Sequence, residues 1–188
     1  MAAFEPAYPG SIFSLTNHEI HVVSARAGDR ENGQIATWIM PATLVEGHPR
    51  IVAILSPQNF THSLIAASGM FALSLLRADQ HELVPLFGLV SGRDIDKFDG
   101  LALARTPAGL PVLADSCGWA ECKIVTAIDA GDRMLYLADV TAQQVFASPV
   151  PLRKRAAFAA QSDEIRALLV EKHLRDGARD ASLLRTVF

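Results

Sequence analysis

The eight-residue segment SPQNFTHS is dense in polar side chains, among them Ser56, Asn59, Thr61, His62 and Ser63. The segment lies between the apolar run IVAIL and the pattern THSLIAAS, which predicts a short helix ended by a glycine. A helix N-terminus presents unpaired N–H groups and the positive end of the helix dipole, so polar groups gathered there can bind a phosphate. A simpler interpretation is that Asn59 or Thr61 only caps the helix, which needs just one such residue.

A second candidate site lies in the segment ATWIMPAT. Trp38 and Met40 alternate with Thr37 and Ile39, so one face of the predicted strand is large and apolar. Pro41 cannot donate a ladder hydrogen bond, which places the end of the strand at a sheet edge or a bulge. Backbone groups left free there can bind a planar group, although the edge of an ordinary sheet has the same pattern.

The third candidate is the polar loop SGRDIDKFDG, residues 91–100. It holds Arg93, Lys97 and Phe98 among three aspartates. The two cations can reach an anionic ligand, and the phenyl ring can cover a ring of that ligand. The alternative is a solvated loop that Phe98 anchors to the core.

Other catalytic and metal-binding patterns are missing from the sequence. It has no GxSxG nucleophile elbow, no P-loop and no GxGxxG after a strand. Cys117 and Cys122, in CGWAEC, fit neither a CxxC redox motif nor a zinc knuckle, and we expect a buried, reduced pair. The six histidines are scattered, so we predict no metal site. Acid–base catalysis by a pair of carboxylates stays open, but no pair stands out in the sequence.

The elements that must position these residues are mostly strands. We expect turn signals in RAGDRENG and a long hairpin in which DAGD joins WAECKIVTAI to RMLYLADVTAQQV. Further strands are predicted over residues 18–25, 34–43, 51–56 and 71–76. Many strands with only short helices between them favour an antiparallel barrel over a parallel βαβ sheet.

Two further helices are predicted from capping patterns. Residues 79–88 have Asp79 and Glu82 at capping-box spacing, with Pro85 inside the run, so this helix is short or kinked. Residues 162–177 have Ser162 as a cap and Gly177 as a stop, and form an amphipathic helix whose apolar face is covered by the barrel or by a second subunit.

Length and composition exclude several classes of protein. The 188 residues fit one domain with an appendage, and we divide the chain into a barrel domain, residues 1–150, and a C-terminal helical extension, residues 151–188. The net charge of −3 and the short basic run PLRKR argue against nucleic-acid binding. No apolar run is long enough to cross a membrane, and the N-terminus does not resemble a signal peptide, so we expect a soluble, cytoplasmic protein.

Taken in order, NGQIATWIMPAT, IVAIL with SPQNFTHSLI, GMFALSLL, LVPLFG, SGRDIDKFDG and the AECKIV/GDRMLYLADV hairpin resemble the flavin reductase-like, FMN-binding split-barrel family. The resemblance covers roughly residues 18–145. It implies a mainly β fold, an antiparallel split β-barrel with short connecting helices and a C-terminal amphipathic helix. It also implies a homodimer with FMN near the subunit interface, which reduces flavin with NADH or NADPH or passes its electrons onward.

The resemblance assigns three groups of cofactor-binding residues. The isoalloxazine ring is expected against the backbone of Thr37, Trp38, Ile39 and Met40. The ribityl chain and phosphate are expected at Ser56, Asn59, Thr61 and His62. The site is expected to be closed by Lys97 and Phe98.

One position departs from the family pattern. Many members have a histidine after the Gly-Asp of the hairpin turn, where it meets the nicotinamide, whereas this chain has Arg133. An arginine can attract the phosphates of a nicotinamide dinucleotide but cannot replace imidazole in stacking or hydrogen bonding.

The leading hypothesis is therefore an NAD(P)H-dependent flavin reductase, in which hydride passes to N5 of FMN and the reduced flavin stays bound or goes to a partner oxygenase. Since the cofactor accepts the hydride, no side chain needs to act as a catalytic acid or base. The first alternative is an electron-transfer flavoprotein whose bound FMN is reduced by a protein donor. The second is a split-barrel module that binds another ligand, such as pyridoxal phosphate or heme, without reduction.

Overall fold

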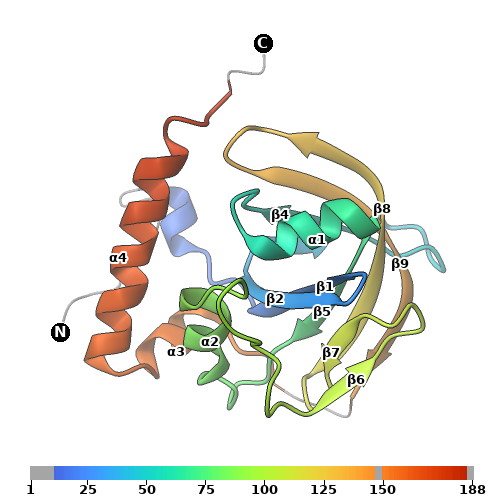
Figure 1. The fold of residues 1–188 in the computed structure, drawn as a ribbon, viewed down its shortest axis with the longest axis horizontal. Helices are drawn as coiled ribbons and strands as arrows, with labels where there is room; N and C mark the ends of the chain where they lie inside the picture. The colour runs from blue at the N-terminus through green and yellow to red at the C-terminus, as the bar shows by residue number, and fades with distance from the viewer. Residues whose placement is uncertain (1–10, 147–149, 186–188) are drawn as a thin grey trace.

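The computed structural model describes residues 11–146 and 150–185. A seven-stranded antiparallel sheet, ordered β2-β1-β5-β8-β9-β4-β3, curls into a half-barrel, and a two-stranded sheet, β6-β7, lies beside it (Figure 1). The strands are β1 (His21–Ala27), β2 (Arg30–Ala36), β3 (Ile39–Pro41), β4 (Arg50–Leu55), β5 (Met70–Leu75), β6 (Leu103–Arg105), β7 (Pro111–Leu113), β8 (Gly118–Asp129) and β9 (Met134–Val145). The helices are a 3-10 turn (Ile12–Leu15), α1 (Phe60–Ser68), α2 (Leu83–Leu89), α3 (Lys154–Ala159) and α4 (Asp163–Asp180).

The expected single strand over residues 34–43 is wrong, because the chain changes partners inside it. β2 pairs with β1, whereas β3 pairs with β4 at the opposite edge of the sheet. Thr37 and Trp38 lie between the two strands and carry the chain from one edge to the other. The turn signals in RAGDRENG are confirmed at Gly28 (φ 58°) and Asp29, which form the bend, and β1 and β2 extend through the rest of the segment.

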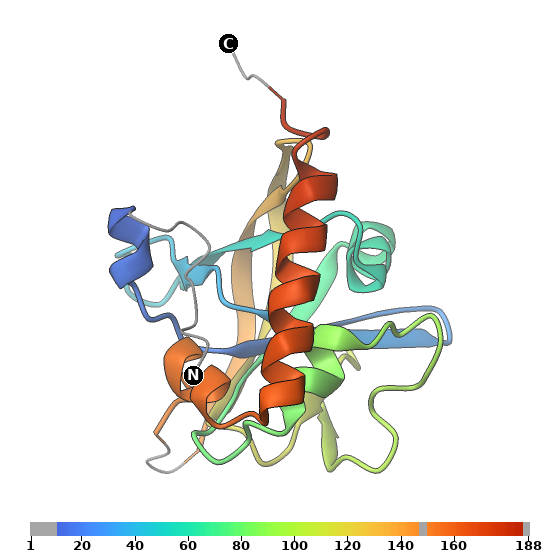
Figure 2. The same ribbon diagram turned by 90° about the vertical axis from the view of Figure 1, so that its left-hand side faces the viewer.

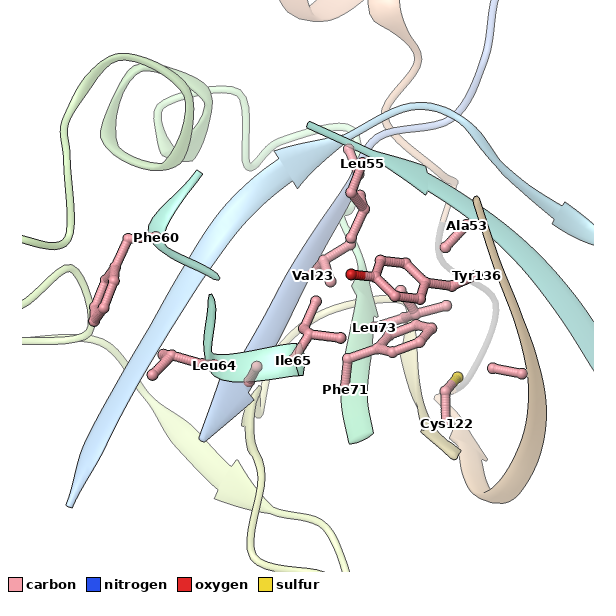
Figure 3. Packing of buried hydrophobic residues seen from close by; sticks show 13 residues of the cluster. Val23, Ala53, Leu55, Phe60, Leu64, Ile65, Phe71, Leu73, Cys122 and Tyr136 are labelled. Atoms are coloured by element: carbon pink, nitrogen blue, oxygen red, sulfur yellow. The ribbon is translucent and has the colours of Figure 1, made fainter. Parts of the chain in front are cut away.

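The main hydrophobic core fills the space between the concave face of the sheet and α1. Val23, Phe71 and Tyr136 come from three strands, and Ile65 of α1 packs among them with no exposed surface (Figure 3). α1 ends at Gly69 in the left-handed region (φ 70°), where glycine has no Cβ strain. Because α1 is anchored in this way, its N-terminus is held at the open side of the barrel.

A second core lies under the C-terminal helices. Leu76, Phe87 and Leu152 form its buried centre, and Leu169 of α4 packs against it. Ser162 caps α4 by accepting a hydrogen bond from the N–H of Ile165 at 3.3 Å, as the sequence predicts. The helix runs along the outside of the barrel from α2 to the tip of the β8-β9 hairpin (Figure 2). The C-terminal extension is therefore covered at least in part by the barrel of its own chain.

Two predictions about helix boundaries are wrong. Gly177 does not stop α4, which continues to Asp180. Asp79 pairs with Arg77 at 2.9 Å instead of forming a capping box, and α2 begins later, at Leu83. The helix is short, as predicted, and Pro85 falls in its first turn and causes no kink.

Cys117 and Cys122 are both buried and free, as expected. None of the helices in residues 11–146 and 150–185 combines the length and the apolar character that crossing a membrane requires. The same residues contain no cluster of three or more His, Cys, Asp or Glu side chains suited to a metal ion.

Candidate functional site

A cavity of about 1070 Å³ opens between the edge of the barrel and α4. Its walls come from β2, the N-terminus of α1, α2, the loop after α2 and the inner face of α4. Seven of the residues singled out from the sequence line it: Thr37, Ser56, Asn59, Thr61, Arg93, Lys97 and Arg133. The folded chain thus brings together residues from all three candidate segments and from the hairpin turn.

The N-terminus of α1 forms one end of this cavity. Asn59 has the extended backbone of an N-cap (φ −76°, ψ 141°), but its side chain makes no capping hydrogen bond. The capping explanation therefore does not account for the amide of Asn59, which lines the cavity. Thr61 is fully buried, and its hydroxyl accepts a hydrogen bond from the side-chain amide of Asn32 at 2.8 Å. Ser56 accepts one from the N–H of Gln58 at 3.3 Å.

His62 faces away from the cavity. Its Nδ1 lies 2.6 Å from the hydroxyl of Tyr136 on β9. Burial lowers the pKa of His62 below its ordinary value, against the opposing effect of Asp129, and burial raises the pKa of Tyr136 to about 12. The pair therefore holds α1 against the sheet, and His62 is not among the residues that line the cavity.

The residues after β2 are divided between the cavity and the sheet. Thr37 lines the cavity, whereas Ile39 packs against the main core and Met40 is half exposed opposite Val52 of β4. The carbonyl of Trp38 accepts a hydrogen bond from the N–H of Ile54 at 3.0 Å. The indole of Trp38 lies under Arg133, whose guanidinium carbon is 5.5 Å from the ring centroid.

Lys97 and Phe98 are both buried, but only Lys97 lines the cavity. The ammonium group of Lys97 donates hydrogen bonds to the carbonyls of Gly33 (3.1 Å) and Phe87 (3.3 Å). Burial, with a smaller effect from Lys172, lowers the pKa of Lys97 to about 8. Phe98 packs on Phe87 with ring centroids 5.7 Å apart and belongs to the second core. Phe98 therefore anchors the loop, which was the alternative interpretation of this residue.

Two polar residues of β2 were not predicted as part of the site. Asn32 and Gln34 are 3% and 5% exposed, and both line the cavity. Their signal in the sequence is that polar side chains occupy alternate positions, 32 and 34, on the inward face of a strand. A strand that is polar where it should be apolar indicates either an internal partner or a ligand.

The cavity is positively charged, although the whole chain has a net charge of −3. One carboxylate, Asp176, lines it. The cations that line it are Arg93, Lys97, Arg133, Lys154, Lys172, Arg175 and Arg179. Ion pairs offset part of this charge, including those of Lys172 with Asp176 and of Arg133 with Asp180. A helix N-terminus beside these cations suits an anionic group such as a phosphate.

The fold and the cavity together define the class of protein: a curled antiparallel half-barrel with a cavity at its edge that can bind a phosphate. The family model described as "Flavin reductase like domain" matches residues 13–153, and the chain belongs to this family. The split-barrel fold predicted from the sequence is therefore confirmed. Residues 154–188, which include α3 and α4, lie beyond the match, so this part of the chain supplies one wall of the cavity from outside the family domain.

Individual relatives agree with this assignment. The chain is 33% identical over 144 residues to the high molecular weight rubredoxin of Moorella thermoacetica, covering 76% of the chain but only 62% of that longer protein. It is 25% identical over 135 residues to the ferric-chelate reductase (NAD(P)H) of Archaeoglobus fulgidus, covering 71% of the chain and 79% of that protein. Among solved structures, BorF, the flavin reductase component of a bacterial two-component tryptophan halogenase, superposes with a TM-score of 0.68 at 25% identity and covers 78% of this chain and 91% of BorF.

Proposed function

We propose that this protein is an NAD(P)H-dependent flavin reductase that binds FMN in the cavity between the barrel and α4. The observation that carries the proposal is that the cavity joins the N-terminus of α1, with the uncommitted amide of Asn59, to Thr37 at the open edge of the sheet. One FMN molecule can place its phosphate at the N-terminus of α1 and its planar ring at Thr37 only if a single cavity contains both regions. FMN, when bound, supplies the position that accepts hydride from NADH or NADPH.

The residues present fit this cofactor. Ser56, Asn59 and Thr61 offer polar groups near the helix N-terminus, and Lys97 and Arg93 add positive charge at the same end. FMN carries one phosphate, so a single anion site is enough for it. The chain's own contribution is to bind, orient and shield the cofactor, since no side chain in the cavity needs to move a proton for the hydride to be accepted.

The partners of this reaction are also part of the proposal. BorF is described as a component of a two-component halogenase, and by analogy we propose that reduced flavin passes from this protein to a partner oxygenase. A homodimer is proposed because Leu168 of α4, which does not line the cavity, is 49% exposed and leaves apolar surface for a second copy. Sedimentation at micromolar concentration tests this, and a monomeric mass contradicts it. We place the protein in the cytoplasm.

A second candidate is an electron-transfer flavoprotein with permanently bound FMN that a protein donor reduces. Two observations favour it: the relative named as a high molecular weight rubredoxin, and Arg133, which pairs with Asp180 and contacts Trp38 where many family members have histidine. In this case NADH and NADPH do not reduce the flavin.

An anaerobic titration separates the two candidates. The protein is loaded with FMN, and NADH or NADPH is added while the flavin absorbance is followed. Bleaching at catalytic rates supports the reductase, whereas an oxidised flavin that dithionite reduces but neither pyridine nucleotide does supports the electron-transfer protein. Gel filtration of the reduced sample then tests release, because a diffusible flavin elutes apart from the protein. A protein that binds no flavin overturns both candidates.

A further inference from the structure

Gln34 is a buried polar residue whose hydrogen bonding is incomplete. Its side-chain carbonyl oxygen, Oε1, has no partner, and the residue is 5% exposed. Among the buried side-chain polar atoms of the described residues, only this oxygen and Nδ1 of His21 lack a partner. A buried acceptor without a donor costs stability, so an amide retained there without a ligand is unfavourable. His21 does not line the cavity, whereas Gln34 does.

The strand places Gln34 between the two ends of the cavity. Asn32 and Gln34 lie on the same face of β2, since side chains alternate along a strand, and Asn32 donates its hydrogen bond to Thr61 of α1. At about 3.3 Å per residue, Gln34 lies roughly 7 Å along the chain from Asn32 and roughly 10 Å from Thr37. The helix end of the cavity is therefore at Asn32, the sheet edge is at Thr37, and Gln34 lies between them.

We infer that the carboxamide of Gln34 binds the ribityl chain of the flavin, an inference that rests on the proposed function. With the phosphate at α1 and the ring at Thr37, the linking chain must pass the middle of this wall. That chain carries neighbouring hydroxyl groups, each of which can donate and accept a hydrogen bond. A carboxamide offers one acceptor and two N–H donors, so one hydroxyl satisfies Oε1 while a neighbouring one accepts from Nε2.

The test compares Gln34→Met with the wild-type protein for two flavins. Methionine keeps the length and apolar volume of the side chain but removes its hydrogen bonding. The ligands are FMN and an analogue in which an unsubstituted five-carbon chain joins the same ring to the same phosphate. Dissociation constants are measured by quenching of flavin fluorescence. We expect Gln34→Met to weaken FMN binding about tenfold, as the loss of one or two hydrogen bonds implies, and to leave the affinity for the analogue unchanged.

Thermal unfolding of the flavin-free proteins separates a role in ligand binding from a structural role, because the two roles predict changes of opposite sign in the stability of the apoprotein. Because the substitution removes an unpaired buried acceptor, apo Gln34→Met is expected to be at least as stable as the wild type. A clear loss of apo stability overturns the inference, since Gln34 would then be supporting the fold.

The remaining outcomes are also decisive. Equal weakening of both flavins means that Gln34 contacts the ring or the phosphate, and unchanged FMN binding means that it makes no contact; either result overturns the inference while the proposed function stands. A wild-type protein that does not bind FMN overturns the proposed function and the ligand assigned to Gln34 with it.

Discussion

Asp180, the last residue of α4, accepts a hydrogen bond from the guanidinium of Arg133 at 2.5 Å, which ties the C-terminal helix to the tip of the β8-β9 hairpin. The carboxylate is buried and also accepts a hydrogen bond from Arg179 at 2.8 Å. Burial alone would raise the pKa of Asp180, but the hydrogen bonds from the two arginines outweigh burial and hold this pKa below its ordinary value. The same interaction fixes Arg133 at the cavity wall, over Trp38.

Replacing Asp180 with Asn is expected to loosen the end of α4 and to cost about 1.5–3 kcal/mol of unfolding free energy, as for lost hydrogen bonds to charged groups. Since the pKa of Asp180 is lowered by folding, its contribution is present above the ordinary aspartate pKa and is lost as the pH falls through the folded-state value. Denaturant unfolding at neutral and acidic pH measures both effects, and amide exchange in α4 locates them.

The matched control for this substitution is Glu171→Gln on the same helix. Glu171 and its partner Arg175 are 69% and 66% exposed and 3.8 Å apart, so this substitution is expected to change stability by less than about 0.5 kcal/mol. If Asp180→Asn is as mild as the control, the contact between α4 and the hairpin does not contribute measurably to stability.

The buried ammonium group of Lys97 predicts an unusual dependence of stability on pH. Its pKa is lowered to about 8 in the folded protein, so between about pH 8 and the ordinary lysine value the unfolded chain holds a proton that the folded chain has released. Unfolding free energy therefore rises with pH in this window, by roughly 2–3 kcal/mol for this one group. Lys97→Met is expected to lack this rise, which urea unfolding of the apoprotein from pH 7 to 10 measures. Identical pH profiles for the two proteins contradict the prediction.

Gly92 is expected to tolerate no side chain, because Asn32 occupies the space. A Cβ on Gly92 would lie 1.9 Å from Oδ1 of Asn32, so Gly92→Ala must displace that amide from Thr61. We expect a loss of about 1–3 kcal/mol in stability, as for a buried polar group left unpaired, and weaker FMN binding. Chemical unfolding and fluorescence titration measure the two effects.

Gly88→Ala is the control for the Gly92 substitution. Gly88 lies in α2, and a Cβ there would make ordinary contacts with Ile35 (3.8 Å) and Leu169 (3.9 Å). Alanine in the helix is expected to raise stability by about 0.5–1 kcal/mol. Because Gly88 also lines the cavity, this variant is a control for stability and not for FMN binding. If Gly92→Ala is as stable as Gly88→Ala, Asn32 can move without a loss of stability.

The parts of the fold that were predicted from the sequence depend on neighbouring residues. Ser162 and Gly69 mark the start of α4 and the end of α1, because capping is decided within one helical turn. The break at Thr37 could not be predicted in this way, since it depends on β2 and β3 pairing with different strands at opposite edges of the sheet. The continuation of α4 past Gly177 could not be predicted either, because the helix ends where Asp180 contacts Arg133, which is distant in the sequence.

The same distinction between neighbouring and distant residues applies to the candidate site. Asn59 and Lys97 could be identified from residue type and local context, and both line the cavity. His62 and Phe98 have the same local signals but face Tyr136 and Phe87, because side-chain direction is set by packing across the barrel. The wall formed by α4 has no signal within the barrel sequence, since it depends on where a distant helix docks.

The role of Asn59 in binding phosphate is tested by an almost isosteric change, Asn59→Asp. Aspartate caps a helix as well as asparagine does, so the fold and α1 should be unaffected. Its negative charge faces the cavity where we place the phosphate, and like-charge repulsion is expected to weaken FMN binding by about tenfold or more. Riboflavin, which has the same ring and chain without the phosphate, provides the comparison. Fluorescence quenching measures the binding of both flavins, and the affinity for riboflavin should be nearly the same for the wild type and for Asn59→Asp. A loss that is equal for FMN and riboflavin would place the phosphate away from the N-terminus of α1, whereas a loss confined to FMN fixes the cofactor's orientation in the cavity.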